Sequence, residues 1–520
     1  MKILEQSVPL NKSNIWNLQT SIYSKLGLQA WTHRGVPSYM TNNPYTAKQY
    51  AQLIVSYLRD GLDPNSKKPI SSSDPIYIFD LGAGTGRFAY VFLKQFFKLI
   101  KGIQYLESLT IRYVLTDIVD SNLDFCEHHN YLKSFIEKGI IDFAHFSYDQ
   151  KEPLQLRLAK TALDHTNVKN PVILIANYFF DTIPQDLIRY HGGNWEEGHI
   201  TIKGPESTSS LGHPFEDTEI LEKLHFEFSY LPISPEKKAN YEGIPEAHSL
   251  IDEYSNKLDG VPFTVPQGAF KTIRFFEELS QSRLLVISGD QGYSSIEQLK
   301  NSGEPRFAIH GAFSMAVNYN ALARFFDKKQ GKGFVTTLSD PVFQVFVGLL
   351  GGNASDYPEL SVAHKEYLES FEPKDYWSLA TLVQSEWTNP SLDTLLLILK
   401  LGSWDPMNLY TFYSMIREQV PTATPKQKEE LRTAIHEVWE NFYPIHALEG
   451  EFIMNLGVMF FEMQYFAEAL GFLQRSLMIT GDNATTYTNM AACYLSLFNP
   501  EAAHKCFEKA KAMHDAVGVA

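Results

Sequence analysis

The chain has 520 residues, 44% of them hydrophobic and 20% charged, and at roughly 150 residues per domain this length indicates two to four folded units. Such a composition excludes collagen-like, coiled-coil and wholly disordered proteins. With 60 acidic and 45 basic residues the formal net charge is −15. Because a protein that binds nucleic acid through its phosphates normally carries a basic surplus, we expect no nucleic-acid partner.

Cysteine usage and the apolar runs predict a soluble cytoplasmic protein. The three cysteines, Cys126, Cys493 and Cys506, form neither a disulfide framework nor a metal-binding pattern. The first residues, MKILEQSVPLNKSNIW, lack the apolar core of a secretory signal. The longest apolar stretches fall far below the about 18 residues of a membrane span. We therefore expect no metal site and no membrane partner.

In chain order, residues 16–62 are predicted to be mostly helical, most clearly Tyr45–Leu62, which Gly61 helps to end. Between 75 and 190, helical stretches alternate with four continuous apolar runs, at residues 76–81, 111–117, 141–146 and 172–177. A fifth run, 284–288, follows a predicted helix at 272–282. Apolar strands separated by helices predict a mostly parallel sheet that is covered on both faces.

Two further regions break this alternation. Residues 201–262 are rich in Gly, Pro, Ser and Glu, and we interpret them as an insertion or lid over the ligand edge of the sheet. From 356 onward the chain is predicted to be all-helical. At an offset of 34 residues, Asn455-Leu456-Gly457 aligns with Asn489-Met490-Ala491, and the later pairs keep small and large residues in register. This pattern resembles tetratricopeptide repeats, at about 450–483 and 484–517.

The sequence Asp80-Leu81-Gly82-Ala83-Gly84-Thr85-Gly86 carries the clearest chemical signal. An apolar strand ends in an acid, three alternating glycines follow, and an amphipathic helix begins. Glycines let a ligand approach the backbone closely, and the helix N-terminus offers free N–H groups to an anion. The main alternative is a dinucleotide-binding loop, but the spacing DxGxGxG departs from the dinucleotide fingerprint. It matches the first motif of class I S-adenosylmethionine-dependent methyltransferases, so Asp80, Gly82, Ala83, Gly84 and Gly86 are candidate cofactor-binding residues.

Strand-terminal residues further along the chain extend the predicted cofactor site. Asp117, at the end of the second run and followed by Ile118, can accept hydrogen bonds from both ribose hydroxyls. An acid here fits the dinucleotide hypothesis as well. After the third run, Tyr148 and Asp149 lie where class I methyltransferases contact adenine, although an ordinary turn explains this segment about as well.

After the fourth run, residues 176–184 read ANYFFDTIP, which resembles the ANEFFDALP motif of the MidA-like methyltransferase family. The segment from Tyr39 to Pro44, with Thr41, resembles the family's "F-x-T-x-P-E". Trp195 matches its "W-R-E" hairpin, Leu284–Gly292 its "I-D-Y-G" strand and residues 316–320 its "A-x-V-D-F-S". The resemblance covers roughly residues 35–352. It implies a seven-stranded Rossmann-like sheet, S-adenosyl-L-methionine as cofactor, Thr41 in its site, and a methyl acceptor such as an arginine of a partner protein.

The chain departs from the family at three places, with Tyr178 in place of Glu, Asp290-Gln291 in the "D-Y-G" segment and Asn318 in place of Asp. Asn177, Tyr178 and Asp181 are the candidate catalytic residues, because they follow the fourth strand beside the point where such sheets bind ligands. For Asp181, capping of a following helix is an equal alternative. His310 and Asp290 are lesser candidates.

We therefore predict two domains. Residues 1–355 form a class I methyltransferase domain with N-terminal helices (16–62), a core (75–200 and 270–350) and an insertion or lid (201–262). Residues 356–520 form a helical domain that ends in the tetratricopeptide-like repeats. The first hypothesis is a methyltransferase that acts on a protein recruited by the repeats. Two alternatives remain open: a non-catalytic assembly factor, and a small-molecule methyltransferase whose repeats brace or dimerise the enzyme.

Overall fold

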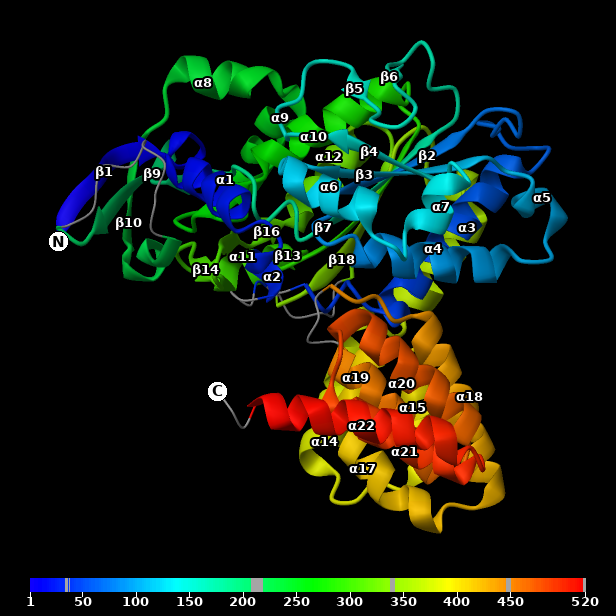
Figure 1. Ribbon diagram of the computed structural model, residues 1–520. Coiled ribbons are helices and arrows are strands. Elements are labelled where there is room, and N and C mark those ends of the chain that lie inside the picture. Colours follow the sequence, from blue (N-terminus) through cyan, green and yellow to red (C-terminus); the bar gives the residue numbers. More distant parts are fainter. Residues whose placement is uncertain (33–35, 37, 207–217, 337–341, 446–449, 518–520) are drawn as a thin grey trace. The chain divides into compact units, whose positions relative to one another are not determined.

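The structure is a computed structural model that describes residues 1–32, 36, 38–206, 218–336, 342–445 and 450–517 (Figure 1). The chain divides into two compact units, Met1–Lys374 and Asp375–Ala520. The division follows residue 374 rather than the predicted 355, because helix α13 (Pro358–His364) packs on α3 (Pro44–Leu62) of the first unit. There the Asp60 carboxylate accepts hydrogen bonds from the N–H groups of Glu359 and Leu360, at 3.0 and 2.9 Å.

A seven-stranded sheet forms the centre of the first unit. Its strands are β2 (Ile76–Leu81), β3 (Ile111–Asp117), β4 (Ile141–His145), β7 (Val172–Asn177), β12 (Leu284–Asp290), β17 (Lys332–Phe334) and β18 (Gln344–Leu349), in the order β17-β18-β12-β7-β2-β3-β4. Only β18 runs antiparallel to the other six. The predicted mostly parallel sheet is confirmed. Strand order reverses between β2 and β7, which is where doubly wound sheets bind ligands.

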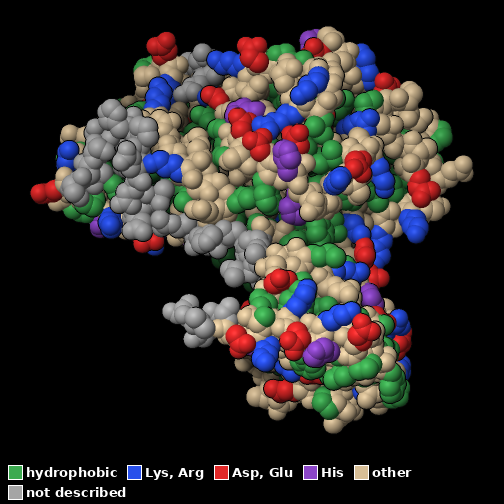
Figure 2. All heavy atoms as spheres, in the orientation of Figure 1, with side chains coloured by type: hydrophobic (Ala, Val, Ile, Leu, Met, Phe, Trp, Pro, Cys, Tyr) green, Lys and Arg blue, Asp and Glu red, His purple; other side chains and the backbone are tan. Residues whose placement is uncertain are grey.

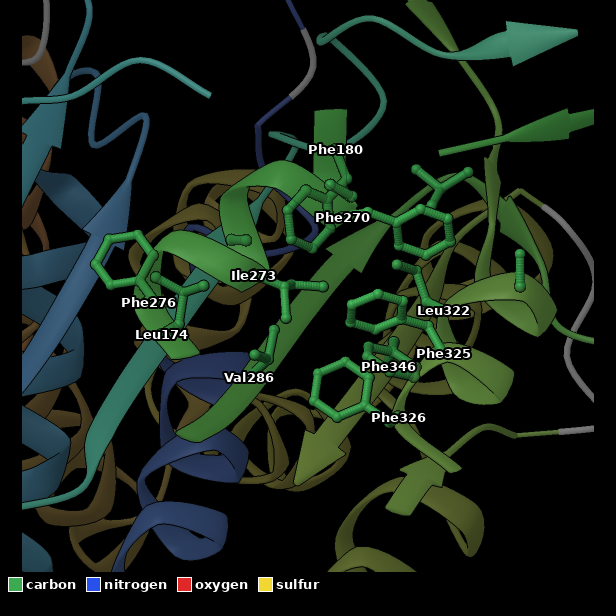
Figure 3. Close-up of a cluster of buried hydrophobic side chains, with 14 of the residues drawn as sticks. Leu174, Phe180, Phe270, Ile273, Phe276, Val286, Leu322, Phe325, Phe326 and Phe346 are labelled. Carbon is green, nitrogen blue, oxygen red and sulfur yellow. The ribbon is translucent and has the colours of Figure 1, made fainter. Parts of the chain in front are cut away.

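Helices cover both faces of this sheet because successive side chains of each buried strand point to opposite faces. On one face, Tyr113 of β3 packs against Phe92 of α4 (Arg87–Ile100), with ring centroids 5.4 Å apart. On the other, Phe79 of β2 packs against Phe276 of α10 (Gln267–Leu279), at 5.0 Å. Figure 3 shows α10 side chains lying over β7 and β12. Phe270 of α10 also stacks on Phe325 of α12 (Tyr319–Lys328), with ring centroids 4.6 Å apart.

A second, antiparallel sheet lies beside the first. It has the order β1-β9-β8-β11, with β10 also paired to β9, and its strands are β1 (Lys2–Pro9), β8 (Asp186–His191), β9 (Asn194–Gly204), β10 (His225–Pro232) and β11 (Phe263–Val265). The described part of the predicted insertion supplies the end of β9, β10, α8 (Pro235–Asn240) and α9 (Pro245–Ser255). Residues 207–217 of that insertion lie outside the described residues.

Short elements complete the first unit. They are α1 (Ile15–Leu26), α2 (Gln29–Thr32), α5 (Gln104–Glu107), α6 (Asp120–His128), α7 (Lys133–Glu137), α11 (Ile296–Asn301), β5 (Leu154–Gln155), β6 (Ala162–Leu163), β13 (Gly292–Tyr293), β14 (Phe307–Ile309), β15 (Phe313–Met315) and β16 (Val317–Asn318). Helix α3 begins where the sequence predicts, because the Asn43 side chain accepts a hydrogen bond from Thr46 N–H and Pro44 occupies the first turn.

The second unit is helical. It contains most of α14 (Pro373–Glu386), then α15 (Leu392–Leu401), α16 (Pro406–Thr411), α17 (Tyr413–Gln419), α18 (Pro425–Glu440), α19 (Gly450–Glu462), α20 (Phe466–Thr480), α21 (Ala484–Ser496) and α22 (Pro500–Val517). The last four helices fall in the two windows predicted to repeat. Gly457 permits α19 and α20 to approach closely, because a Cβ there would lie 2.8 Å from Cγ of Leu473.

The surface carries charges of both signs. Figure 2 shows acidic and basic side chains interspersed over the visible face of each unit. None of the helices in the described part of the chain combines the length and the hydrophobicity that a membrane span requires.

Candidate functional site

A cavity of about 180 Å³ lies at the carboxyl ends of β2, β3 and β7, at the switch point of the main sheet. Its wall comes from the loops after these strands and β4, and from the N-terminal helices. The lining residues include Asp80, Gly82–Thr85, Asp117, Ile118, Asn122, Phe146–Tyr148, Asn177–Phe179 and Thr182–Pro184 from the loops, and Trp16, Gln19, Tyr23, Trp31 and Thr41 from the N-terminal segment. Most of the predicted site residues therefore meet at one cavity.

The glycine loop adopts a backbone that other residues rarely tolerate. Gly82, Gly84 and Gly86 have φ values of 66°, 54° and 73°, all in the left-handed region. A Cβ on Gly84 would lie 3.0 Å from the Trp31 ring, and one on Gly82 would lie 3.3 Å from the ring of Phe179. Gly86 does not line the cavity; it is the N-cap residue of α4.

Asp80, the penultimate residue of β2, has a buried carboxylate that faces Tyr113. The Tyr113 hydroxyl donates a hydrogen bond to Oδ2 of Asp80, at 2.9 Å. Burial raises the pKa of Asp80 to about 7; the Tyr113 hydrogen bond opposes this shift and the charge of Asp117 adds to it. A cation in the cavity would favour the ionised form, because an opposite charge stabilises a carboxylate.

Asp117 joins the end of β3 to the glycine loop. Its Oδ2 accepts hydrogen bonds from Gly84 N–H at 3.0 Å and from the Asn122 amide at 3.4 Å, and its Oδ1 accepts one from Val119 N–H at 2.8 Å. Burial raises the pKa of this carboxyl, and the backbone hydrogen bonds oppose the shift. A carboxylate has about four lone-pair sites, so acceptor capacity is left for the hydroxyls of a ribose.

The structure separates the two predicted adenine-contacting residues. Tyr148 lines the cavity with Phe146 and Ser147. Asp149 is exposed and does not line it, and its Oδ1 accepts a hydrogen bond from the Ser147 hydroxyl at 2.6 Å. A contact between Asp149 and adenine therefore stays a prediction that needs a rearrangement of this turn.

Asn177 and Tyr178, two of the candidate catalytic residues, lie in the wall. Oδ1 of Asn177 accepts a hydrogen bond from the Tyr50 hydroxyl at 2.9 Å. Gly289 makes room for this contact, because a Cβ there would lie 2.7 Å from the Tyr50 oxygen. Tyr178 has a φ of 50°, which is rare for a side chain of this size. Strained backbone of this kind clusters at functional sites.

Asp181, the third candidate, lies behind the wall and does not line the cavity. It is 3% exposed, and its carboxyl group hydrogen-bonds to that of Asp290. The chain turns from Asp181 directly into β8 at Asp186, so the alternative of a helix cap is wrong. A direct catalytic role for Asp181 stays a prediction.

Sequence reasoning missed the contribution of the N-terminal helices. Trp16, Gln19 and Tyr23 of α1 and Trp31 of α2 line the cavity, and the rings of Tyr23 and Trp31 stack at 5.8 Å. Aromatic residues at helical spacing are also typical of core packing, so the sequence offered no signal for this role. Of the described residues in 201–262, none lines the cavity, and the predicted lid stays a prediction.

Residues 65–275, less than half of the chain, match the model of a family described as "Putative S-adenosyl-L-methionine-dependent methyltransferase". This match supports the methyltransferase family that the glycine loop predicts. It confirms S-adenosyl-L-methionine as the predicted cofactor. It specifies no methyl acceptor. A comparison with curated proteins found no match.

Two crystal structures from Burkholderia thailandensis share low similarity with the chain. One, of an uncharacterized protein, is 13% identical with a TM-score of 0.34, and the other, of a superfamily member bound to S-adenosyl-homocysteine, is 12% identical with a TM-score of 0.33. Each match covers 66% of this chain and 95% of the other. At these TM-scores, neither structure bears on the fold or the function of this chain.

The residues of the cavity fit S-adenosyl-L-methionine. Gly82 and Gly84 form a cradle that a Cβ would fill, Asp80 is a buried carboxylate suited to a cationic group, and Asp117 is an acceptor suited to hydroxyls. Ligand pockets commonly have about 300–1,000 Å³, so binding of a whole nucleoside requires the cavity to widen. Trp31 lines the cavity and lies against Gly84, so we expect its displacement to widen the cavity.

Proposed function

We propose that the chain is an S-adenosyl-L-methionine-dependent methyltransferase that binds its cofactor in this cavity. In this proposal the methionine end lies at Gly82–Gly84 and the ribose at Asp117. One observation carries it: the glycine loop and the acid of the next strand meet at a cavity at the switch point, inside the segment that matches a methyltransferase family.

The chemistry assigned to the residues is mainly positioning. S-adenosyl-L-methionine supplies an activated methyl group when it is bound. Asp80 and Asp117 orient the cofactor, the aromatic wall excludes water, and Asn177 and Tyr178 lie where an acceptor would approach. Holding a nucleophile in line with the methyl group converts a bimolecular step into an effectively unimolecular one, which lowers the barrier by several kcal/mol.

A protein is the proposed methyl acceptor, recruited by the C-terminal helices. The resemblance to the MidA-like family supports a protein acceptor, and the 34-residue repeat supports tetratricopeptide-like hairpins, α19–α20 and α21–α22, as the recruiting element. Tyr178 stands where that family has an acid, so we do not assign arginine as the acceptor. The small-molecule methyltransferase and the non-catalytic assembly factor remain the alternatives.

A single labelling experiment separates the three. The purified full chain is incubated with a lysate from cells that lack it and with cofactor carrying a tritiated methyl group. Tritium in a protein band supports the proposal, and tritium only in the small-molecule fraction supports the first alternative. No transfer, together with cofactor binding, supports the second. The Asp117→Ala variant is the control, because transfer that persists in it does not come from this site.

A further inference from the structure

Asp181 and Asp290 form a buried pair of acids behind the cavity wall. They are 3% and 0% exposed, and their carboxyl groups hydrogen-bond to each other. Oδ1 of each acid has no other described group within hydrogen-bond distance. Two carboxylates in contact and shielded from water cannot both be ionised. One proton therefore lies between the two side chains.

The pair connects segments that are distant in the sequence. Oδ2 of Asp290, at the end of β12, accepts hydrogen bonds from Phe180 N–H at 3.2 Å and from the Ser288 hydroxyl at 3.4 Å. The carbonyl oxygen of Asp181 accepts one from Met315 N–H of β15, at 2.8 Å. Phe180 and Asp181 belong to the loop from Asn177 to Pro184, most of which lines the cavity.

We propose that Asp181 and Asp290 are a positioning pair, in which the shared proton holds the loop from Asn177 to Pro184 in the shape that binds the cofactor. This inference rests on the proposed function, because it gives the pair a role in the same site. Neither residue contacts the cavity, so the pair acts through the loop. When the proton leaves, two negative charges face each other and drive the loop and β12 apart.

The surroundings of the pair make the proton necessary. The hydroxyl groups of Ser288 of β12 and Ser314 of β15 hydrogen-bond to the pair. The hydroxyl groups of Tyr23 of α1, Tyr50 of α3, Tyr178 after β7 and Tyr319 of α12 interact with it electrostatically. No Lys, Arg or His is among the described groups that shift the pKa values of the pair. Burial raises the pKa of both acids, so the pair keeps its shared proton to a higher pH than exposed carboxyl groups would.

The test measures the affinity of the full chain for S-adenosyl-homocysteine, by calorimetry at about pH 6.5 and about pH 9. Asp290→Asn keeps an oxygen for Phe180 N–H and donates an amide N–H to Asp181 without a titratable proton. Asp290→Ala removes both contacts. Asp60→Ala is the matched control, because Asp60 is also a buried acid that accepts two backbone hydrogen bonds, between α3 and α13. Thermal unfolding of each variant verifies that it is folded.

From the lower to the higher pH, the affinity of the wild type should fall by a larger factor than the affinity of Asp290→Asn. We expect the two factors to differ at least about fivefold. Asp290→Ala should bind at least about tenfold more weakly than the wild type at both, which is about 1.4 kcal/mol, and Asp60→Ala should bind as the wild type does. Titration of the ligand's own amino group affects binding to the wild type and to Asp290→Asn equally, so the comparison of the two proteins cancels its effect. The inference is overturned if Asp290→Ala binds like the wild type, or if the wild type and Asp290→Asn depend on pH identically. If the wild type binds no ligand, the proposed function itself fails.

Discussion

The carboxylate of Asp117 and the backbone N–H of Gly84 form a 3.0 Å hydrogen bond between residues 33 positions apart. This bond fixes the end of β3 against the glycine loop that follows β2. The acid predicted to bind the ribose therefore also holds the loop predicted to bind the methionine end. Substitutions at either residue should affect both the stability and the ligand affinity of the protein.

Replacing Asp117 by Ala should weaken cofactor binding by about 10- to 100-fold, the effect of losing hydrogen bonds to a charged acceptor. It should also lower the free energy of unfolding by about 1–3 kcal/mol, because Gly84 and Val119 lose their acceptor. Calorimetry and denaturant unfolding measure the two effects. Asp142→Ala is the matched control, since Asp142 is also buried and accepts backbone hydrogen bonds, from Leu158 and Ala159. An affinity of Asp117→Ala equal to that of the wild type would refute the ribose assignment.

Asp80 should make the stability of the protein depend on pH. Its pKa is about 7 in the folded chain and about 3.9 in an unfolded one, so the folded state binds more protons between these values. Stability should therefore fall as pH rises from about 4 to about 7 and level off above. Asp80→Asn should remove this fall and be more stable at about pH 8 by up to about 4 kcal/mol, at 1.36 kcal/mol per pKa unit.

Denaturant unfolding at several pH values measures this difference, and calorimetry should show weaker cofactor binding by Asp80→Asn. If the stability of the wild type and that of Asp80→Asn depended on pH in the same way, this would contradict the conclusion that the Asp80 carboxyl group is buried without a compensating charge.

Gly84→Ala should destabilise the chain for two reasons that can be separated. Its φ of 54° costs a residue with a side chain about 1–2 kcal/mol, and its Cβ would lie 3.0 Å from the Trp31 ring. Gly102→Ala is the control for the first cost, because Gly102 has a φ of 83° and no atom within 4 Å of a Cβ. Gly84→Ala should cost more than Gly102→Ala in thermal unfolding, and Trp31→Leu should reduce the excess. Equal costs would show that Trp31 does not lie on the loop.

Two glycines of the helical unit should respond to alanine with opposite signs. Gly457→Ala should destabilise the unit, because the new Cβ would meet Leu473 and the carbonyl oxygen of Ala469 at 2.8 and 3.2 Å. Gly471→Ala, in α20, should stabilise it by about 0.5–1 kcal/mol, because no atom lies within 4 Å and alanine favours the helix. Thermal unfolding of both variants measures the signs. Stabilisation by Gly457→Ala would contradict close packing of α19 on α20.

Five of the seven strands, β2, β3, β4, β7 and β12, could be predicted because each is a continuous apolar run, and β2, β3 and β7 have the predicted ends. Strands β17 and β18 are not among the predicted runs. Asp80, Gly82 and Asp117 could be placed in a common site because the carboxyl ends of parallel strands meet at one edge. The role of Trp31 could not be predicted, because no local sequence pattern distinguishes an aromatic residue that lines a cavity from one that packs in a hydrophobic core. The pairing of Asp181 with Asp290 joins residues 109 positions apart, and only the folded arrangement of β7 and β12 reveals it.

A crystal structure of the full chain with S-adenosyl-homocysteine bound tests the central claim most directly. We predict the ribose within hydrogen-bond distance of the Asp117 carboxylate, the amino-acid end against Gly82 and Gly84, and the base beside Tyr148. The Trp31 ring should have moved from its place over Gly84. A ligand bound elsewhere, or a ribose that makes no contact with Asp117, would contradict the account.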